Sequence, residues 1–255
     1  MGAYARASIE AMVVMALLLV ALFVAPGFAS AQGGINLSWD DCGTFGTELK
    51  FFACDTNAGV SVLYVSAIPG VPLPQMNGVG IVIDIRTSQP ALSDWWQMGT
   101  GGCRALGITG QYNFAAGPFN CYDIWAGNAA GGLNYAAGFG APNRARLRAV
   151  AAIPGSAAAD EATEMYLFAF HLSNRKSTGA GSCAGCTDKA CIVLNSVQLT
   201  QPAGVGDYTI TNPINRQSVS WRCLSSISGH TGECTSFCTT PTRNPSWGSI
   251  KSHYR

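Results

Sequence analysis

Charged residues are scarce in this sequence. Lysine, arginine, aspartate and glutamate make up 11% of its 255 residues, and the formal net charge is +1. Nucleic-acid binding requires a basic face, and attraction to an anionic membrane surface requires a cluster of Lys and Arg. The composition therefore predicts no nucleic-acid partner. It favours an extracellular β protein whose surface consists of Ser, Thr, Asn and Gly.

Histidine is also scarce, and the three histidines are His171, His230 and His253. A serine nucleophile needs a neighbouring base, and no G-x-S-x-G elbow is present. A glycosidase needs two carboxylates across a cleft, and no pattern marks a pair among the available ones. These are Asp40, Asp41, Asp55, Asp84, Asp94, Asp123, Glu161 and Glu164. The sequence predicts no catalytic residue, metal or cofactor, and a hydrolase with an unrecognised site is an alternative.

Only one long apolar run is present, at the N-terminus. The run Met12–Val24 is uncharged, Arg6 precedes it, and Ala29-Ser30-Ala31 supplies the small residues that a signal peptidase requires. Its 13 residues are fewer than the ~20 that span a bilayer as a helix. We therefore expect a signal peptide over residues 1–31, cleavage before Gln32, and an exported chain without a further membrane span.

Ten cysteines follow the expected cleavage site, and an even number in an exported protein is typical of a disulfide framework. They are Cys42, Cys54, Cys103, Cys121, Cys183, Cys186, Cys191, Cys223, Cys234 and Cys238. Their spacing favours two local bridges, Cys42 with Cys54 and Cys103 with Cys121, and pairing of the last six among themselves. The Cys183-Ala-Gly-Cys186 motif also suits zinc or redox chemistry. Export and the lack of a nearby histidine favour structural disulfides.

Short β-type runs separated by Gly, Pro and Asn recur along the chain. Gly80–Arg86 and Arg144–Ala152 alternate between apolar and polar residues, as half-buried strands do, and Met165–Leu172 is the expected central core strand. The other candidates are Ile35–Trp39, Leu49–Cys54, Ser61–Ser66, Ile108–Phe114, Cys191–Leu199, Asp207–Thr211 and Ser218–Arg222. Because no long amphipathic helix separates them, we expect an all-β, antiparallel two-sheet sandwich, Ig-like or cohesin-like, over residues 32–222.

Two segments depart from this strand pattern. Cys121–Gly140 is rich in Gly and Ala, and we expect a loop excursion with one helical turn. Residues 223–255 form a cysteine-bearing tail, in which Asn244-Pro245 has the form of a helix start. Trp247, Ile250 and Tyr254 then share one face of a short C-terminal helix. This helix either docks on the sandwich or is a recognition tag for sorting or attachment.

Tryptophans are the candidates for ligand binding, because exposed aromatic side chains stack on sugar rings or anchor protein partners. The four candidates are Trp95, Trp96, Trp125 and Trp247. Trp95 and Trp96 would point to opposite faces of an extended segment, so one could be exposed. Core packing of both is the alternative.

Several motifs are specific enough to compare with other sequences. They are Ile35-Asn-Leu-Ser-Trp39 with Asp41-Cys42-Gly43, Phe52-Ala-Cys-Asp-Thr-Asn57, Cys183-Ala-Gly-Cys186, Cys191-Ile-Val-Leu-Asn195, Leu199-Thr-Gln-Pro202 with Gly204-Val-Gly-Asp207, and the ending Thr242 to Arg255. With these motifs the chain resembles a set of uncharacterised exported bacterial proteins, which implies export but no activity. The strand pattern is loosely similar to cohesin-like and carbohydrate-binding sandwiches, an analogy of fold only.

The sequence thus predicts a non-catalytic secreted or cell-surface sandwich. Its expected role is adhesion, surface assembly, or binding of a glycan or a surface protein. The alternatives are the hydrolase named above and a self-associating subunit of an extracellular filament or layer.

Mass spectrometry of the secreted protein tests the export and disulfide predictions together. We expect a chain that starts at Gln32 and gains ten hydrogen atoms on reduction, two for each of five disulfides among the ten cysteines. A chain that retains residues 1–31, or that gains no mass on reduction, would contradict them.

Overall fold

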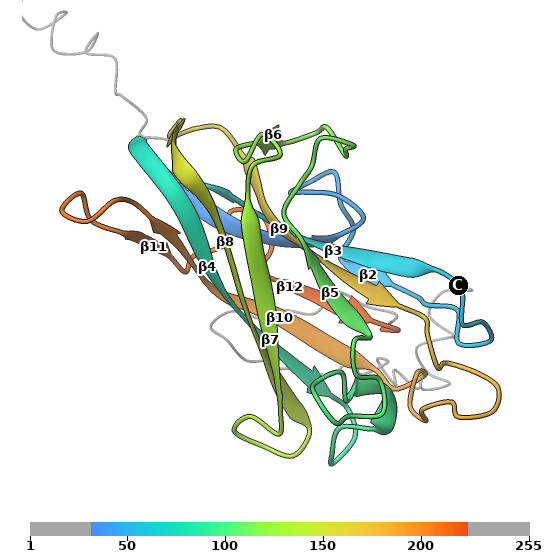
Figure 1. Cartoon of the computed structure of the whole chain (residues 1–255). Helices are drawn as coiled ribbons and strands as arrows, with labels where there is room; N and C mark the ends of the chain where they lie inside the picture. The colour runs from blue at the N-terminus through green and yellow to red at the C-terminus, as the bar shows by residue number, and fades with distance from the viewer. Residues whose placement is uncertain (1–31, 224–255) are drawn as a thin grey trace, which may run out of the picture. The chain divides into compact units, whose positions relative to one another are not determined.

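The computed structural model describes residues 32–223, which form two packed β-sheets (Figure 1). The strands are β1 (Gly34–Trp39), β2 (Leu49–Lys50), β3 (Val60–Ile68), β4 (Leu73–Thr87), β5 (Ile108–Gln111), β6 (Tyr122–Asp123), β7 (Ala130–Ala137), β8 (Arg144–Ala159), β9 (Met165–Ser173), β10 (Ala190–Thr200), β11 (Tyr208–Ile210) and β12 (Ser218–Trp221). A short 3₁₀ helix, η1 (Asp94–Trp96), precedes β5. The predicted all-β sandwich is confirmed. Among these residues no helix is long and apolar enough to cross a membrane.

The two sheets differ in size. Sheet A has the order β1-β3-β9-β5, and β6 also pairs with β9. Sheet B has the order β2-β12-β10-β4-β8-β7, and β11 also pairs with β10. The pairings are antiparallel except for β2 with β12 and β6 with β9. The edge strands β5 and β7 contact each other, so they lie on the same side of the sandwich.

The core lies between the sheets and follows the alternation of the sequence. On β4, Ile81, Ile83 and Ile85 are buried, as the sequence predicts. On β8, Ala145, Leu147 and Ala149 are buried and alternate with three arginines. Arg146 binds Asp84 of β4 on the outer face, with 2.7 Å between its Nε and Oδ1 of the carboxylate. Period-2 patterning therefore sets the inward face of both strands.

The disulfides join segments that are far apart in the sequence. The pairs are Cys42–Cys121, Cys54–Cys186 and Cys103–Cys183, with sequence separations of 79, 132 and 80 residues. The predicted local bridges are therefore wrong, because sheet pairing brings distant loops together at each end of the sandwich. The predicted pairing of the last six cysteines among themselves is wrong for the same reason, since Cys186 pairs with Cys54 and Cys183 with Cys103. The structural interpretation of Cys183-Ala-Gly-Cys186 is confirmed.

The remaining cysteines divide between described and undescribed residues. Cys191 and Cys223 are also disulfide-bonded. Cys234 and Cys238 lie outside the described residues, as do the expected signal peptide and the C-terminal helix.

The main error in the predicted strands concerns β7. Its sequence, AGGLNYAA, lies within the expected loop excursion, yet it pairs with β8 along its whole length. Gly and Ala have a weak strand propensity, so the pairing with β8 stabilises this strand. Two predicted strands are shorter than expected: only Leu49–Lys50 and Ile108–Gln111 are extended and paired.

The disulfide pairing generates a stability prediction. Replacing both Cys103 and Cys183 by alanine removes a crosslink over 80 residues of chain. The chain-entropy relation gives a loss of roughly 4 to 5 kcal/mol in the free energy of unfolding. Urea denaturation measures the loss, and an unchanged midpoint would contradict it. Peptide mapping of the unmodified protein should find Cys103 linked to Cys183 and not to Cys121.

Candidate binding site at the Cys42–Cys121 end

The outer face of sheet A carries polar residues that are shielded from solvent. Asn36 and Ser38 of β1 and Ser66 of β3 are fully buried, although they alternate with inward-facing core residues. Tyr166 of β9 is fully buried beside them. The loops 40–47 and 112–121 lie against these residues, and Cys42–Cys121 joins the two loops. The result is a polar cluster held under two crosslinked loops.

Asp41 connects both loops to the sheet. Its Oδ1 accepts hydrogen bonds from the Tyr166 hydroxyl at 2.6 Å and from the Cys42 N–H at 2.7 Å. Its Oδ2 accepts one from the Asn120 side chain at 2.5 Å. The Ser38 hydroxyl donates to the Asp41 carbonyl oxygen. Hydrogen bonds to a charged group are the stronger kind, so Asp41 fixes both loops on sheet A.

Glu164 has the same role at the start of β9. Its Oε1 accepts hydrogen bonds from Asn36 Nδ2 and from the Ser66 hydroxyl, each at 2.7 Å. Its carbonyl oxygen accepts the N–H of Tyr122. Gly43 lies so close that a Cβ there would be 2.3 Å from Glu164 Oε2, and its φ is +49°. Only glycine allows both this approach and this backbone conformation.

Burial in this cluster changes the chemistry of two tyrosines. Desolvation raises the pKa of Tyr166, and the hydrogen bond to Asp41 raises it further. Desolvation also raises the pKa of Tyr64, with smaller contributions from the charges of Asp41 and Asp40. Both phenols therefore keep their protons to a higher pH than an exposed tyrosine does.

Three exposed aromatic side chains surround the same disulfide. Phe45 is 60% exposed, Phe119 78% and Tyr122 54%. Phe45 lies in the turn that begins at Cys42, while Phe119 and Tyr122 flank Cys121. Tyr122 also lines an open cavity of about 260 Å³, together with Ala158, Ala159, Asp160, Thr163 and Met165. These aromatic residues were not among the predicted binding residues, because no sequence pattern distinguishes an exposed phenylalanine from a core one.

The predicted tryptophans that lie within residues 32–223 are not available for binding. Trp95, Trp96 and Trp125 are buried, so core packing is correct for all three and their selection as binding residues is wrong. Trp95 and Trp96 lie in η1 and pack against Trp221. Trp125 donates from Nε1 to the Leu167 carbonyl oxygen. Trp247 lies outside the described residues.

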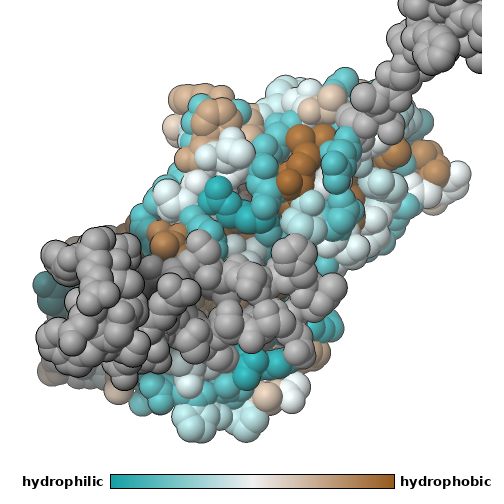
Figure 2. All heavy atoms as spheres, turned by 180° about the vertical axis from the view of Figure 1, so that it is seen from behind, coloured by the Kyte–Doolittle hydropathy of each residue, from teal (hydrophilic) through white to brown (hydrophobic). Residues whose placement is uncertain are grey.

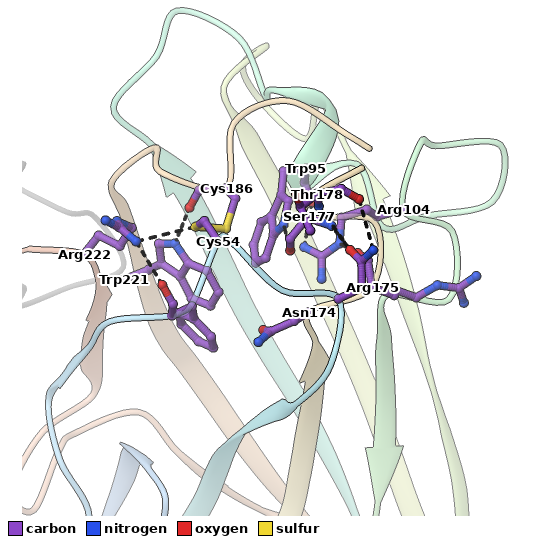
Figure 3. Close-up of a disulfide and its surroundings, with 12 residues drawn as sticks. Cys54, Trp95, Arg104, Asn174, Arg175, Ser177, Thr178, Cys186, Trp221 and Arg222 are labelled. Atoms are coloured by element: carbon purple, nitrogen blue, oxygen red, sulfur yellow. Dashed lines mark hydrogen bonds between the residues drawn. A yellow bond between two sulfur atoms is a disulfide. The ribbon is translucent and has the colours of Figure 1, made fainter. Parts of the chain in front are cut away.

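The tryptophan cluster contains a buried arginine at the opposite end of β9 (Figure 3). The Arg104 guanidinium lies 3.4 Å from the centre of the Trp95 ring. It donates to the carbonyl oxygens of Trp95 at 2.9 Å, Arg175 at 3.2 Å and Ser173. Burial lowers the pKa of Arg104. No carboxylate of the described residues pairs with it, so backbone dipoles and the aromatic ring compensate its charge.

Of the three histidines considered in the sequence, one lies within residues 32–223. His171 lies in the second half of β9, opposite Val62 and Thr109, and burial lowers its pKa. His230 and His253 lie outside the described residues. No group of three or more His, Cys, Asp or Glu side chains in the described part of the chain could hold a metal ion.

Comparison with known proteins gives no family. No family model matches the chain, and no curated protein matches it. One similar solved structure is described as "AvmM Catalyzes Macrocyclization in Alchivemycin A Biosynthesis". The similarity covers 77% of this chain and 92% of that chain, with 10% sequence identity and a TM-score of 0.38. A likeness of this size carries no inference about function.

The Tyr166–Asp41 bond generates a prediction about pH. The folded state raises the pKa of Tyr64, Tyr135 and Tyr166. Above pH ~10 the unfolded chain therefore loses its phenol protons first, and the free energy of unfolding decreases. Tyr166→Phe should lower the free energy of unfolding by about 1.5 to 3 kcal/mol at pH 7. Above pH ~10 the free energy of unfolding of this variant should decrease less than that of the wild type.

Urea denaturation between pH 7 and 11.5 measures both effects. Tyr208→Phe, on β11, is the matched control. Equal high-pH decreases in the wild type and in Tyr166→Phe would contradict the role assigned to Tyr166.

Proposed function

We propose that this protein is an exported, non-catalytic β-sandwich that binds glycans at the Cys42–Cys121 end. The observation that carries the proposal is the display of Phe45, Phe119 and Tyr122 around one disulfide. Faces of sugar rings are apolar enough to stack on such side chains, and an aromatic residue gives much contact area for little loss of side-chain entropy.

The polar cluster supports this function by holding the aromatic residues in place. The hydrogen bonds of Asp41 fix the loops that carry Phe45 and Phe119. The backbone bond between Tyr122 and Glu164 fixes the third aromatic residue. A preorganised surface loses less conformational entropy on binding than a flexible one. The open cavity beside Tyr122 provides room for a sugar unit next to the stacked ring.

The same geometry favours binding over hydrolysis. Asp41 and Glu164 both accept hydrogen bonds from side chains of the protein itself. A glycosidase needs one carboxyl group free to give a proton and another free to attack or to activate water. Export through residues 1–31 is part of the proposal, and the three described disulfides support it, because such bonds persist in oxidising compartments.

On the face drawn in Figure 2, the hydrophobic surface fits a glycan better than a large protein partner. Figure 2 shows one face of the molecule, on which hydrophobic residues form small separate groups among hydrophilic and neutral ones. Large protein interfaces instead use continuous apolar patches. A small group of exposed aromatic residues beside polar groups suits a ligand that presents alternating apolar faces and hydroxyl groups.

A glycan-binding assay with aromatic variants tests the proposal. Affinity electrophoresis against neutral and acidic polysaccharides should show retardation of the full chain by at least one of them. Phe119→Ala and Tyr122→Ala should each weaken that binding roughly tenfold, which corresponds to about 1.4 kcal/mol. Their free energies of unfolding should change little, because both side chains are more than half exposed.

Phe139→Ala is the matched control, because Phe139 is 39% exposed and packs on Arg146 away from this site. Loss of binding in all three variants, or in none, would contradict the assignment of the site. Release of reducing sugar during the assay would identify a hydrolase instead.

A further inference from the structure

A second concavity lies where the two sheet edges meet, between β5 and β7. Its volume is about 300 Å³. It is lined by the loop that follows η1, by residues at the start of β5 and just before it, and by β7. The lining residues are Met98, Gly99, Thr100, Gly101, Ala105, Leu106, Ile108, Leu133, Asn134 and Tyr135. None of them is charged. This edge groove therefore suits an uncharged ligand.

The edge of β7 that faces this groove has free backbone groups. The Gly138 N–H donates to the Arg144 carbonyl oxygen, and this bond closes the β7–β8 hairpin. Hydrogen-bonded pairs alternate along an antiparallel ladder, so Ala130, Gly132, Asn134 and Ala136 point their N–H and C=O groups toward β8. The backbone groups of Gly131 and Leu133 then point away from β8. Within residues 32–223 neither residue makes a backbone hydrogen bond outside the strand ladders.

Leu106, at the rim of the groove, combines two unusual features. Its side chain is 73% exposed, and its φ is +63°. A left-handed backbone conformation is costly for a branched apolar residue, and Asn or Gly would adopt it more readily. An apolar side chain that is both exposed and held in a disfavoured conformation indicates a binding role.

We propose that the edge groove binds an extended, uncharged peptide segment of a partner protein by strand addition to β7. The backbone of the segment hydrogen-bonds to Gly131 and Leu133, with on the order of four bonds. Its alternate side chains enter the groove against Leu106, Ile108 and Leu133. The pairing ends at Tyr135, where a Cβ on Gly99 would lie 2.9 Å from the Tyr135 carbonyl oxygen.

The properties of β7 fit this ligand. Edge strands that avoid pairing carry charges, proline or bulges, and β7 has none of these. A charged segment would lose hydration without gaining a partner in the groove, so the lining selects against it. The proposal does not rest on glycan binding, because the two sites lie at different ends of β9. The aromatic site lies near the start of β9, where β6 pairs with it. The edge groove lies beside β5, which pairs with the second half of β9.

A peptide-binding experiment on the full chain tests the proposal. The probe is a fluorescent decapeptide of alternating threonine and valine between terminal lysines. Its analogue carries N-methyl groups on the amides of one edge, which removes backbone donors and keeps every side chain. Fluorescence anisotropy should show saturable binding of the first peptide and at least tenfold weaker binding of the methylated one.

Leu106→Asn provides the protein variant, because asparagine accepts the left-handed conformation and removes the apolar rim. It should bind the peptide roughly tenfold more weakly while unfolding at the same or a higher urea concentration. Val205→Asn is the matched control, since Val205 is 43% exposed and does not line the groove.

Three results would overturn the proposal. They are equal binding of both peptides, no binding up to millimolar peptide, and equal affinity of Leu106→Asn and the wild type. Light scattering that shows dimers lost in Leu106→Asn would assign the β7 edge to a second copy of the chain instead of a partner peptide. Each of these outcomes leaves the glycan assay unaffected.

Discussion

The structure depends on shielding both faces of sheet A. In most two-layer sandwiches one face of each sheet is open to solvent, but β9 is buried on both faces from Met165 to Phe170. Its outer face therefore requires a cover, and two loops joined by Cys42–Cys121 provide it. The buried polar groups of β1 and β3 would cost free energy without partners. Asp41 and Glu164 supply those partners, and the same contacts fix the exposed aromatic residues on the loops.

The opposite end of the molecule is organised by a different constraint. Arg104 is a buried cation whose compensation comes from carbonyl oxygens and from the Trp95 ring. These contacts hold η1 against the loop after β9, and Cys103–Cys183 joins the same two regions. Tyr135 of β7 donates its hydroxyl to the Trp96 carbonyl oxygen. The wall of the edge groove is therefore rigid on both sides.

Local patterning predicts the strands of this fold better than their partners. The alternation in Gly80–Arg86 and Arg144–Ala152 identifies two strands and their buried faces, and Met165–Leu172 is the central strand. The disulfides could not be paired from spacing, because their geometry depends on which loops meet at the ends of the sheets. β7 could not be predicted as a strand, because its glycines and alanines produce no alternation in hydropathy.

The candidate site was harder to predict than the fold. Tryptophan is the usual marker of an aromatic binding surface, yet here Trp95 and Trp96 are turned inward by η1 and by Arg104. The exposed residues are phenylalanines and a tyrosine next to Cys42 and Cys121. Their exposure depends on the loop cover, which in turn depends on a crosslink between residues 79 positions apart. No local signal contains that information.

The large sequence separation of the disulfide partners also affects how the protein responds to proteolytic cleavage. A cut at the exposed Thr100 would divide residues 32–223 into two pieces, with Cys42 and Cys54 on one and Cys121 and Cys186 on the other. Cys42–Cys121 and Cys54–Cys186 would still hold these pieces together, one at each end of the sandwich. A nicked molecule would thus keep both sheets assembled and continue to present Phe45, Phe119 and Tyr122 after its main chain has been broken.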